Sequence, residues 1–237
     1  MGELWTQAKE NLSFVAVCIL IIAALAILAR LSERFLLQKR QVSPAKRVSV
    51  VAVCAAIAAI LHILDFPLLF LAPEFYKLDF SELPVMLCGF YLGPSAAVAC
   101  EAVKIVLKLL LKGTSTAFVG DFANFAVGCS MVLPAAIIYH LHKSRKGAIL
   151  GLAAGTVILT IFGSAFNAIY LLPKFSQLYG LPLDSIIAMG SKINGSIHSL
   201  STFVLMAVAP LNLIKGASVS VLTMLLYKRV ARPLFGK

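Results

Sequence analysis

Amide and charged side chains occur inside stretches of this sequence that are otherwise apolar. Asn212 and Lys215 lie three residues apart near the start of one apolar run, and Asn167 lies near the end of another. Helix capping would explain Asn212, but a lysine near a helix N-terminus opposes the helix dipole and is better explained by a ligand or an acidic partner. Amides both donate and accept hydrogen bonds. Together with Asn124, these residues predict an outward-facing pocket for a small, polar-edged solute.

A second polar set lies on one helical face. Glu101, Lys104 and Lys108 have the spacing i, i+3 and i+7. We interpret them as an ion pair inside a helical bundle, with Lys108 extending toward the aqueous surface. A proton relay or a substrate contact is the alternative, because an ionisable side chain within a membrane span is costly unless it is paired or faces water.

The composition identifies the class of protein that must position these side chains. Of the 237 residues, 60% are hydrophobic and 13% are charged, and the mean hydropathy is +0.95. Soluble domains are about 45–50% apolar and about 25% charged. Several apolar runs are long enough to cross a bilayer, which leaves no room for a soluble catalytic or nucleotide-binding domain. The net charge of +11 does not indicate nucleic-acid binding, because the arginines fall in three segments beside apolar runs.

Potentially reactive side chains do not form a catalytic pattern. The five cysteines lie in apolar stretches and form no Cys-x-x-Cys pair, so we expect neither a disulfide nor a metal site. Ser196 and His198, with Ser199, could suggest a hydrolase, but residues two apart on a helix point in different directions. The sequence has no Gly-x-Ser-x-Gly motif and no phosphate-binding loop. We expect no enzyme activity and no cofactor.

The apolar runs predict an all-α membrane bundle of seven spans, with the N-terminus outside and the C-terminus inside. Basic residues gather at 31–47, at 140–147 and after 227, which places these segments in the cytoplasm under the positive-inside rule. The acidic segment 65–82 is expected outside. The predicted spans cover residues 14–29, 48–64, 80–92, 95–111, 121–139, 148–172 and 210–227.

The last predicted span begins at Pro210. Proline is disfavoured in a helix interior and favoured in the first turn. Residues 173–209 are then an outer segment, which we expect to fold onto the outer half of the bundle as non-helical backbone.

Four motifs then occur in one order along the chain. They are KLDFSELPVMLCGFYLGPSAA, GDFANFAVGCSMVLPAAIIY, NAIYLLP and APLNLIKG. Between Lys46 and Arg229 the sequence resembles the riboflavin-specific S component of energy-coupling-factor (ECF) vitamin transporters. The resemblance implies a six-helix subunit that captures riboflavin outside the cell as a transported substrate. It also implies association with a transmembrane coupling subunit and two cytoplasmic ATPase subunits.

The resemblance also implies a set of binding residues. In that family, an Asn of an NxxxLLP motif and the Asn and Lys of an NLxK motif bind the flavin, and these correspond to Asn167, Asn212 and Lys215 here. The outer segment after the family's first helix helps to close the site. The residues expected to bind substrate are Asn167, Asn212, Lys215, Asn124, Asp79, Phe66 and Leu68.

Small residues predict the docking surface for the coupling subunit. The family uses an Ala-x-x-x-Ala pattern in its first helix, and both Ala52/Ala56 and Ala55/Ala59 have that spacing. Small side chains let helices approach closely within lipid.

The sequence departs from the six-helix pattern at its N-terminus. Residues 1–45 are expected to form an additional transmembrane helix and a basic cytoplasmic linker, 46–230 the six-helix membrane domain, and 231–237 a basic cytoplasmic tail. We expect a multi-pass protein of a bacterial plasma membrane.

Other transported solutes remain open at this stage. FMN, a riboflavin analogue or another vitamin are alternatives, since Lys77, Lys174 and Lys192 could meet a phosphate near the pocket mouth. A stand-alone proton-coupled carrier would depend on Glu101 and Asp121 and would need no ATPase partner.

Overall fold

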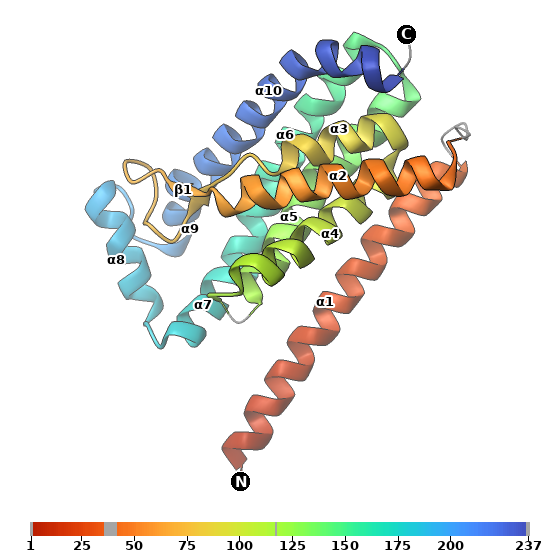
Figure 1. Cartoon of the computed structure of the whole chain (residues 1–237). Helices are drawn as coiled ribbons and strands as arrows, with labels where there is room; N and C mark the ends of the chain where they lie inside the picture. Colours follow the sequence, from red (N-terminus) through yellow and green to blue (C-terminus); the bar gives the residue numbers. More distant parts are fainter. Residues whose placement is uncertain (1, 36–41, 117, 236–237) are drawn as a thin grey trace.

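A computed structural model describes residues 2–35, 42–116 and 118–235, and the side chains of 16–35, 42–116 and 118–227 within them. The chain forms a bundle of long helices with a cluster of short elements at one end (Figure 1). The elements are α1 (Gly2–Phe35), α2 (Pro44–Ile63), β1 (Phe66–Pro67), β2 (Lys77–Leu78), α3 (Glu82–Leu92), α4 (Pro94–Lys112), α5 (Val119–Leu141), α6 (Arg145–Phe166), η1 (Asn167–Leu171), α7 (Leu172–Tyr179), α8 (Leu183–Ile193), α9 (Leu200–Phe203), η2 (Val204–Val208) and α10 (Ala209–Phe235). The helical membrane bundle predicted from composition is therefore confirmed.

Five helical segments in the described part of the chain are long and apolar enough to cross a membrane. They are Ala16–Phe35, Pro44–Ile63, Val119–Leu141, Arg145–Tyr179 and Leu200–Tyr227. The two remaining predicted spans differ in character. α4 carries four charged side chains, and α3 has only 11 residues, which is about 16 Å of helix against a hydrocarbon core of about 30 Å. Seven crossings therefore stay a prediction.

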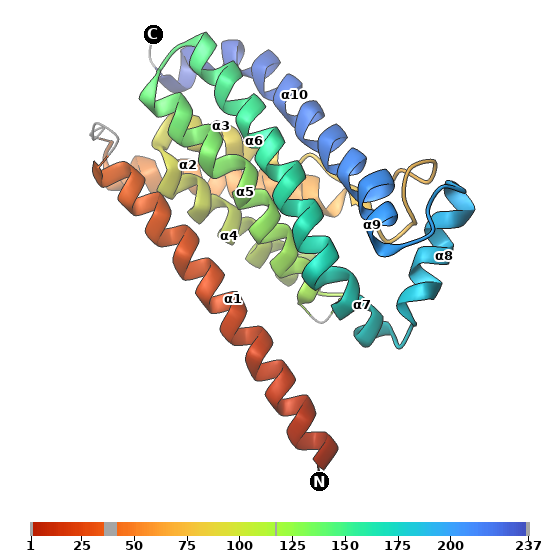
Figure 2. The ribbon, with the colours of Figure 1, turned by 180° about the vertical axis from the view of Figure 1, so that it is seen from behind.

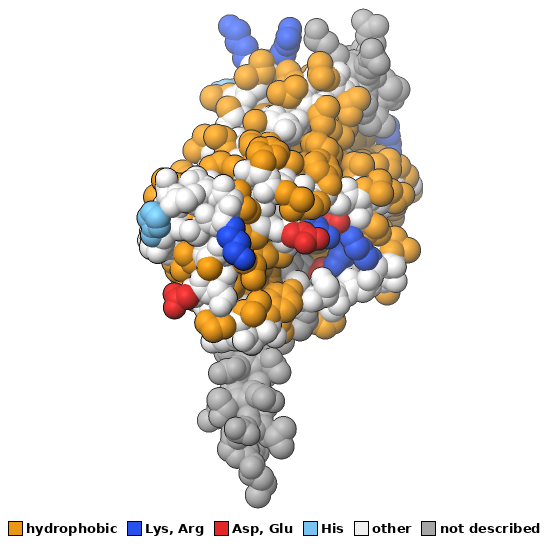
Figure 3. All heavy atoms as spheres, turned by 90° about the vertical axis from the view of Figure 1, so that its left-hand side faces the viewer, with side chains coloured by type: hydrophobic (Ala, Val, Ile, Leu, Met, Phe, Trp, Pro, Cys, Tyr) orange, Lys and Arg blue, Asp and Glu red, His pale blue; other side chains and the backbone are white. Residues whose placement is uncertain are grey.

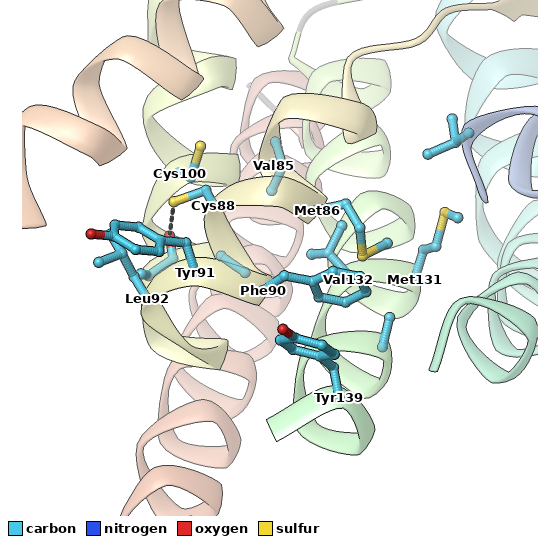
Figure 4. Close-up of a cluster of buried hydrophobic side chains, with 14 of the residues drawn as sticks. Val85, Met86, Cys88, Phe90, Tyr91, Leu92, Cys100, Met131, Val132 and Tyr139 are labelled. Atoms are coloured by element: carbon cyan, nitrogen blue, oxygen red, sulfur yellow. Dashed lines mark hydrogen bonds between the residues drawn. The ribbon is translucent and has the colours of Figure 1, made fainter. Parts of the chain in front are cut away.

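α3 lies at the centre of the bundle. It packs against α2, α4, α5 and α10, and most of its residues are buried. Figure 4 shows its side chains meeting those of α5, with the rings of Phe90 and Tyr139 stacked at 4.4 Å between centroids. A helix that is apolar on all sides is expected in a protein interior, which explains how so short a helix fits among longer neighbours.

The predicted start of the last helix was wrong. The helix begins at Leu200, where Ser199 and Thr202 form a reciprocal capping box, and it continues through η2 into α10. Pro210 therefore lies inside the helix. The π turn directly before it widens the backbone where a proline ring would otherwise clash with the preceding turn.

The predicted non-helical segment 173–209 was also wrong, because most of it is helical. Pro173 follows a second π turn, η1, so α6 continues into α7 past this proline. The chain turns at Gly180, which has a left-handed φ of 61°, and α8 then packs beside α9. The two π turns contact each other, and η1 contains Asn167.

α1 packs along α4 and α5, and it is fixed at its C-terminal end by polar contacts. The Glu33 carboxylate accepts hydrogen bonds from the Ser95 amide at 2.8 Å and from the Ser95 hydroxyl at 2.7 Å. Arg47 of α2 contacts both residues. Seen from behind, the N-terminal part of α1 diverges from the other helices (Figure 2).

Candidate functional site

A cavity of about 400 Å³ opens at the end of the bundle that carries the short elements. Its wall comes from the end of α2, the segment 65–79, the α4–α5 connection, the start of α5, η1 with α7, and α10. Figure 3 shows acidic and basic side chains grouped together on this end of the molecule, in a largely hydrophobic surround. The volume lies within the range of small-molecule sites, about 300–1,000 Å³.

Five of the predicted binding residues line this cavity. They are Asp79, Asn124, Asn167, Asn212 and Lys215. The other two lie elsewhere. Phe66 is in β1 with its ring against Phe80, and the carbonyl of Leu68 accepts two hydrogen bonds within a turn; neither residue is among those that line the cavity.

The Asn167 amide is held in one orientation by its neighbours. The Tyr76 hydroxyl donates a 2.6 Å hydrogen bond to Asn167 Oδ1, and Asn167 Nδ2 donates to the Gly163 carbonyl at 2.7 Å. An amide oxygen has a second lone pair and an amide nitrogen a second proton. Burial raises the pKa of the Tyr76 phenol above its ordinary value, so the hydroxyl stays a donor at neutral pH. Asn167 is thus oriented and still able to bind a ligand.

The Asn212 amide lies against a glycine of the neighbouring helix. A Cβ atom at Gly163 of α6 would sit 2.7 Å from Asn212 Nδ2, so any larger residue there would force the Asn212 side chain to move. Nδ2 is buried, and it has no hydrogen-bond partner among the described residues. A buried donor without a partner is costly. In a cavity wall, such a donor is available to a bound solute.

Lys215 is held between two carboxylates. Its Nζ lies 3.0 Å from Asp79 Oδ2 and 3.1 Å from Glu82 Oε1. His62 Nδ1 lies 3.6 Å from the same Asp79 oxygen. Of the two explanations that the sequence offered for Lys215, a ligand or an acidic partner, the acidic partner is present, and it holds the ammonium group at the cavity wall.

The Asp79 carboxylate stays ionised at neutral pH. Burial alone would raise its pKa, but the Lys215 ammonium and His62 hold that pKa well below the ordinary value. A depressed folded-state pKa adds stability above the unfolded pKa of about 3.9, and this stability is lost as the pH falls through the folded value.

Acid titration of the melting temperature should reveal this contribution. We expect the difference in melting temperature between the wild type and Asp79→Asn to be largest near neutral pH. It should shrink below about pH 4, because the unfolded chain then takes up a proton that the folded carboxylate still excludes. Intrinsic-fluorescence melting in detergent measures both proteins. A difference that stays constant down to about pH 3 would contradict the assignment.

The cavity also contains residues that the sequence did not single out as a site. His62, Phe175 and Tyr179 are in its wall, as are Thr114, Ser115 and Thr116 of the α4–α5 connection. Of these, His62 gave the clearest signal, as a single histidine in an otherwise apolar run.

The two carboxylates on which a proton-coupled carrier would depend, Glu101 and Asp121, each form an ion pair with a lysine. Lys108 lies 2.5 Å from Asp121, and Lys104 contacts Glu101. Of the lysines considered for a phosphate, Lys77 lines the cavity, whereas Lys174 and Lys192 are not among its lining residues.

The residues considered for hydrolysis lie apart from the cavity as well. Ser199 caps the final helix through Thr202, and Ser196 and His198 are exposed beside it.

The two pairs of small residues on α2 face different surroundings. Ala55 and Ala59 are buried inside the chain, whereas Ala52 and Ala56 are exposed. Only the second pair is open to a partner.

The fold and the cavity define a helical membrane protein with a polar, solute-sized pocket at one end. Residues 46–227 match the family model described as "ECF transporter, substrate-specific component". The chain belongs to this family, which confirms the family expected from the sequence.

Relatives and a solved structure agree with the match. The chain is 33% identical to the riboflavin transporter FmnP of Bacillus subtilis over 77% of this chain and 90% of that one. It is 34% identical to the riboflavin transporter RibU of Staphylococcus aureus, with coverage of 78% and 90%. A solved structure titled "Structure and mechanism of the S component of a bacterial ECF transporter" superposes with a TM-score of 0.65 at 34% identity, covering 81% of this chain and 99% of that one.

Proposed function

We propose that this chain captures riboflavin in the described cavity as the S component of an ECF-type vitamin uptake transporter. The observation that carries the proposal is the buried Asn212 Nδ2 group, which has no hydrogen-bond partner within the described part of the chain and belongs to the same cavity wall as Asn167 and Lys215. The names of the relatives supply the substrate.

The chemistry of the wall suits a flavin. One edge of the isoalloxazine ring alternates C=O and N–H groups, and two amides and an ammonium group provide matching donors and acceptors. Phe75, Phe175 and Tyr179 also line the cavity and offer aromatic faces to a flat ring. No covalent step is involved, and we propose no enzyme activity.

The charge pattern supports an orientation for the bundle. We propose that the cavity faces outward, that the N-terminus is outside and the C-terminus inside, and that α3 and α4 complete seven passes through the plasma membrane. Basic residues concentrate at the opposite end, in the α5–α6 connection and around the start of α2, as expected for a cytoplasmic side.

We propose that residues 46–230 form the S-component domain and that residues 1–45 add a helix to it. The coupling subunit is proposed to dock on the exposed pair Ala52/Ala56 of α2, because small side chains permit close helix packing. The two ATPase subunits would then act from the cytoplasm.

Flavin capture is tested with protein purified in detergent. An absorbance scan shows whether flavin is retained, and titration of riboflavin with the protein follows quenching of flavin fluorescence. Saturable, tight quenching is expected, and it should persist in the control Lys192→Ala, which alters an exposed residue of α8. Protein that carries no flavin and causes no quenching would contradict the proposal.

A further inference from the structure

Glu82 contacts the Lys215 ammonium group from outside the cavity. Its Oε1 atom lies 3.1 Å from Lys215 Nζ, almost as close as Asp79 Oδ2 at 3.0 Å. Asp79 and Lys215 line the cavity, whereas Glu82 is not among the lining residues and is 1% exposed. A solute in the cavity would therefore contact Asp79 or Lys215 directly, and Glu82 would act on it only through the lysine.

The start of α3 favours a carboxylate at this place. Glu82 is the first residue of α3, and the N-terminus of a helix favours a negative charge. The turn before it is fixed as well, since the Ser81 amide donates a 2.8 Å hydrogen bond to Asp79 Oδ1. The two carboxylates thus reach Lys215 from one short stretch of chain, whereas Lys215 itself belongs to α10.

Lys104 of α4 is a second cation in contact with Glu82. Its Nζ atom lies 3.5 Å from Glu82 Oε1, the same oxygen that contacts Lys215. It also donates a 3.1 Å hydrogen bond to the Ser81 hydroxyl. Lys104 is fully buried and, like Glu82, is not among the residues that line the cavity. One buried oxygen therefore joins the lysine of the cavity wall to a lysine of the interior.

Each lysine would keep one carboxylate if Glu82 lost its charge. Lys215 would retain Asp79 at 3.0 Å, and Lys104 would retain Glu101, with which it also forms an ion pair. Glu82 is therefore not needed to give either lysine a partner. Its contribution is the place where it holds Lys215, because a side chain bonded to two fixed groups has less freedom to move than one bonded to a single group.

We propose that Glu82 is a positioning residue for the solute site, which fixes the Lys215 ammonium group in the cavity wall without contacting the solute. A lysine that is already ordered in the free protein loses less conformational freedom when a ligand binds. The expected effect on riboflavin affinity rests on the proposed function. The hold of Glu82 on Lys215 does not, because it is a property of the ligand-free protein.

Acylation of Lys215 by acetic anhydride in the ligand-free protein tests the hold on the lysine. The reagent attacks the neutral amine, and a carboxylate in contact with the nitrogen favours the unreactive ammonium form. We expect Lys215 to be acylated about tenfold faster in Glu82→Gln than in the wild type, as measured by mass spectrometry of the peptide that contains it. Glu82→Asp keeps the charge on a side chain one methylene shorter and should give an intermediate rate.

Two comparisons decide how the labelling is interpreted. Glu74→Gln neutralises an exposed carboxylate that is not among the cavity-lining residues, and it should leave the rate at Lys215 unchanged. Equal rates in the wild type and in Glu82→Gln would overturn the proposal. Equal acceleration in Glu82→Gln and Glu82→Asp would also overturn it, because that result would show a loss of packing rather than a loss of charge.

Riboflavin titration of the same variants tests the consequence for binding. We expect Glu82→Gln to lower the affinity about tenfold, the factor for replacing a hydrogen bond between charged groups by one with a neutral acceptor. Glu82→Asp should lie between Glu82→Gln and the wild type. An unchanged or higher affinity in Glu82→Gln would overturn the positioning role. Wild-type protein that binds no riboflavin would instead refute the proposed function, and the labelling would still show whether Glu82 holds Lys215.

Discussion

Replacing Lys215 by methionine is expected to abolish tight riboflavin binding and to destabilise the folded protein. The substitution removes the contact proposed between Lys215 and the ligand, and it also leaves Asp79 and Glu82 without the cation that lies 3.0 and 3.1 Å from them. Breaking a buried ion pair by removing one partner costs about 3–5 kcal/mol. Thermal unfolding and fluorescence titration in the same detergent measure the two effects.

A second substitution separates binding from stability. Lys215→Met combined with Asp79→Asn removes one of the two uncompensated charges, so part of the lost stability should return while riboflavin binding should not. Lys192→Met, at an exposed lysine, serves as the matched control and should leave both quantities unchanged. A Lys215→Met protein that binds riboflavin like the wild type would refute the assignment of this residue to the site.

Asn212→Leu is expected to weaken riboflavin binding about 10- to 100-fold, because a hydrogen bond to a buried polar group contributes about 1–3 kcal/mol. The melting temperature should change little. Asn212 Nδ2 has no hydrogen-bond partner among the described residues, so a leucine of similar size removes an unsatisfied donor without breaking a bond to that atom. Such a loss of affinity without loss of stability is characteristic of a residue whose partner is the ligand.

Fluorescence titration and thermal unfolding check this prediction, with Asn194→Ala as a control at an exposed asparagine outside the cavity. A strongly reduced melting temperature with unchanged riboflavin affinity would show that Asn212 is structural.

The sequence predicted the class of fold and part of the site because both depend on local chemistry. A lysine or an amide inside an apolar run is visible without a structure, and Asn167, Asn212 and Lys215 do meet in one cavity wall. The partners of these residues were not predictable in the same way. Tyr76 and Asn167 are separated by 91 positions, and Lys215 and Asp79 by 136, so their pairing depends on the packing of whole helices.

The rule that proline ends a helix gave a wrong prediction for the last helix. Pro210 would end a regular α-helix, but the π turn before it accommodates the ring. The spacing of Ala52, Ala55, Ala56 and Ala59 did not show which pair faces outward, because this depends on where α3 and α4 cover α2.

The two π turns have a consequence for how insertions and deletions act on this chain. Each π turn accommodates one more residue than a regular α-helical turn, as the bonds from Leu172 to Asn167 and from Ala209 to Val204 show. A deletion of one residue from a regular α-helix rotates everything beyond it by about 100°, the angle of one residue at 3.6 per turn. Within η2, the same deletion would instead remove the extra residue that the wide turn accommodates. We therefore expect Asn212 and Lys215 to keep facing the cavity after a deletion in η2 and to turn away from it after a deletion between Ala209 and Asn212.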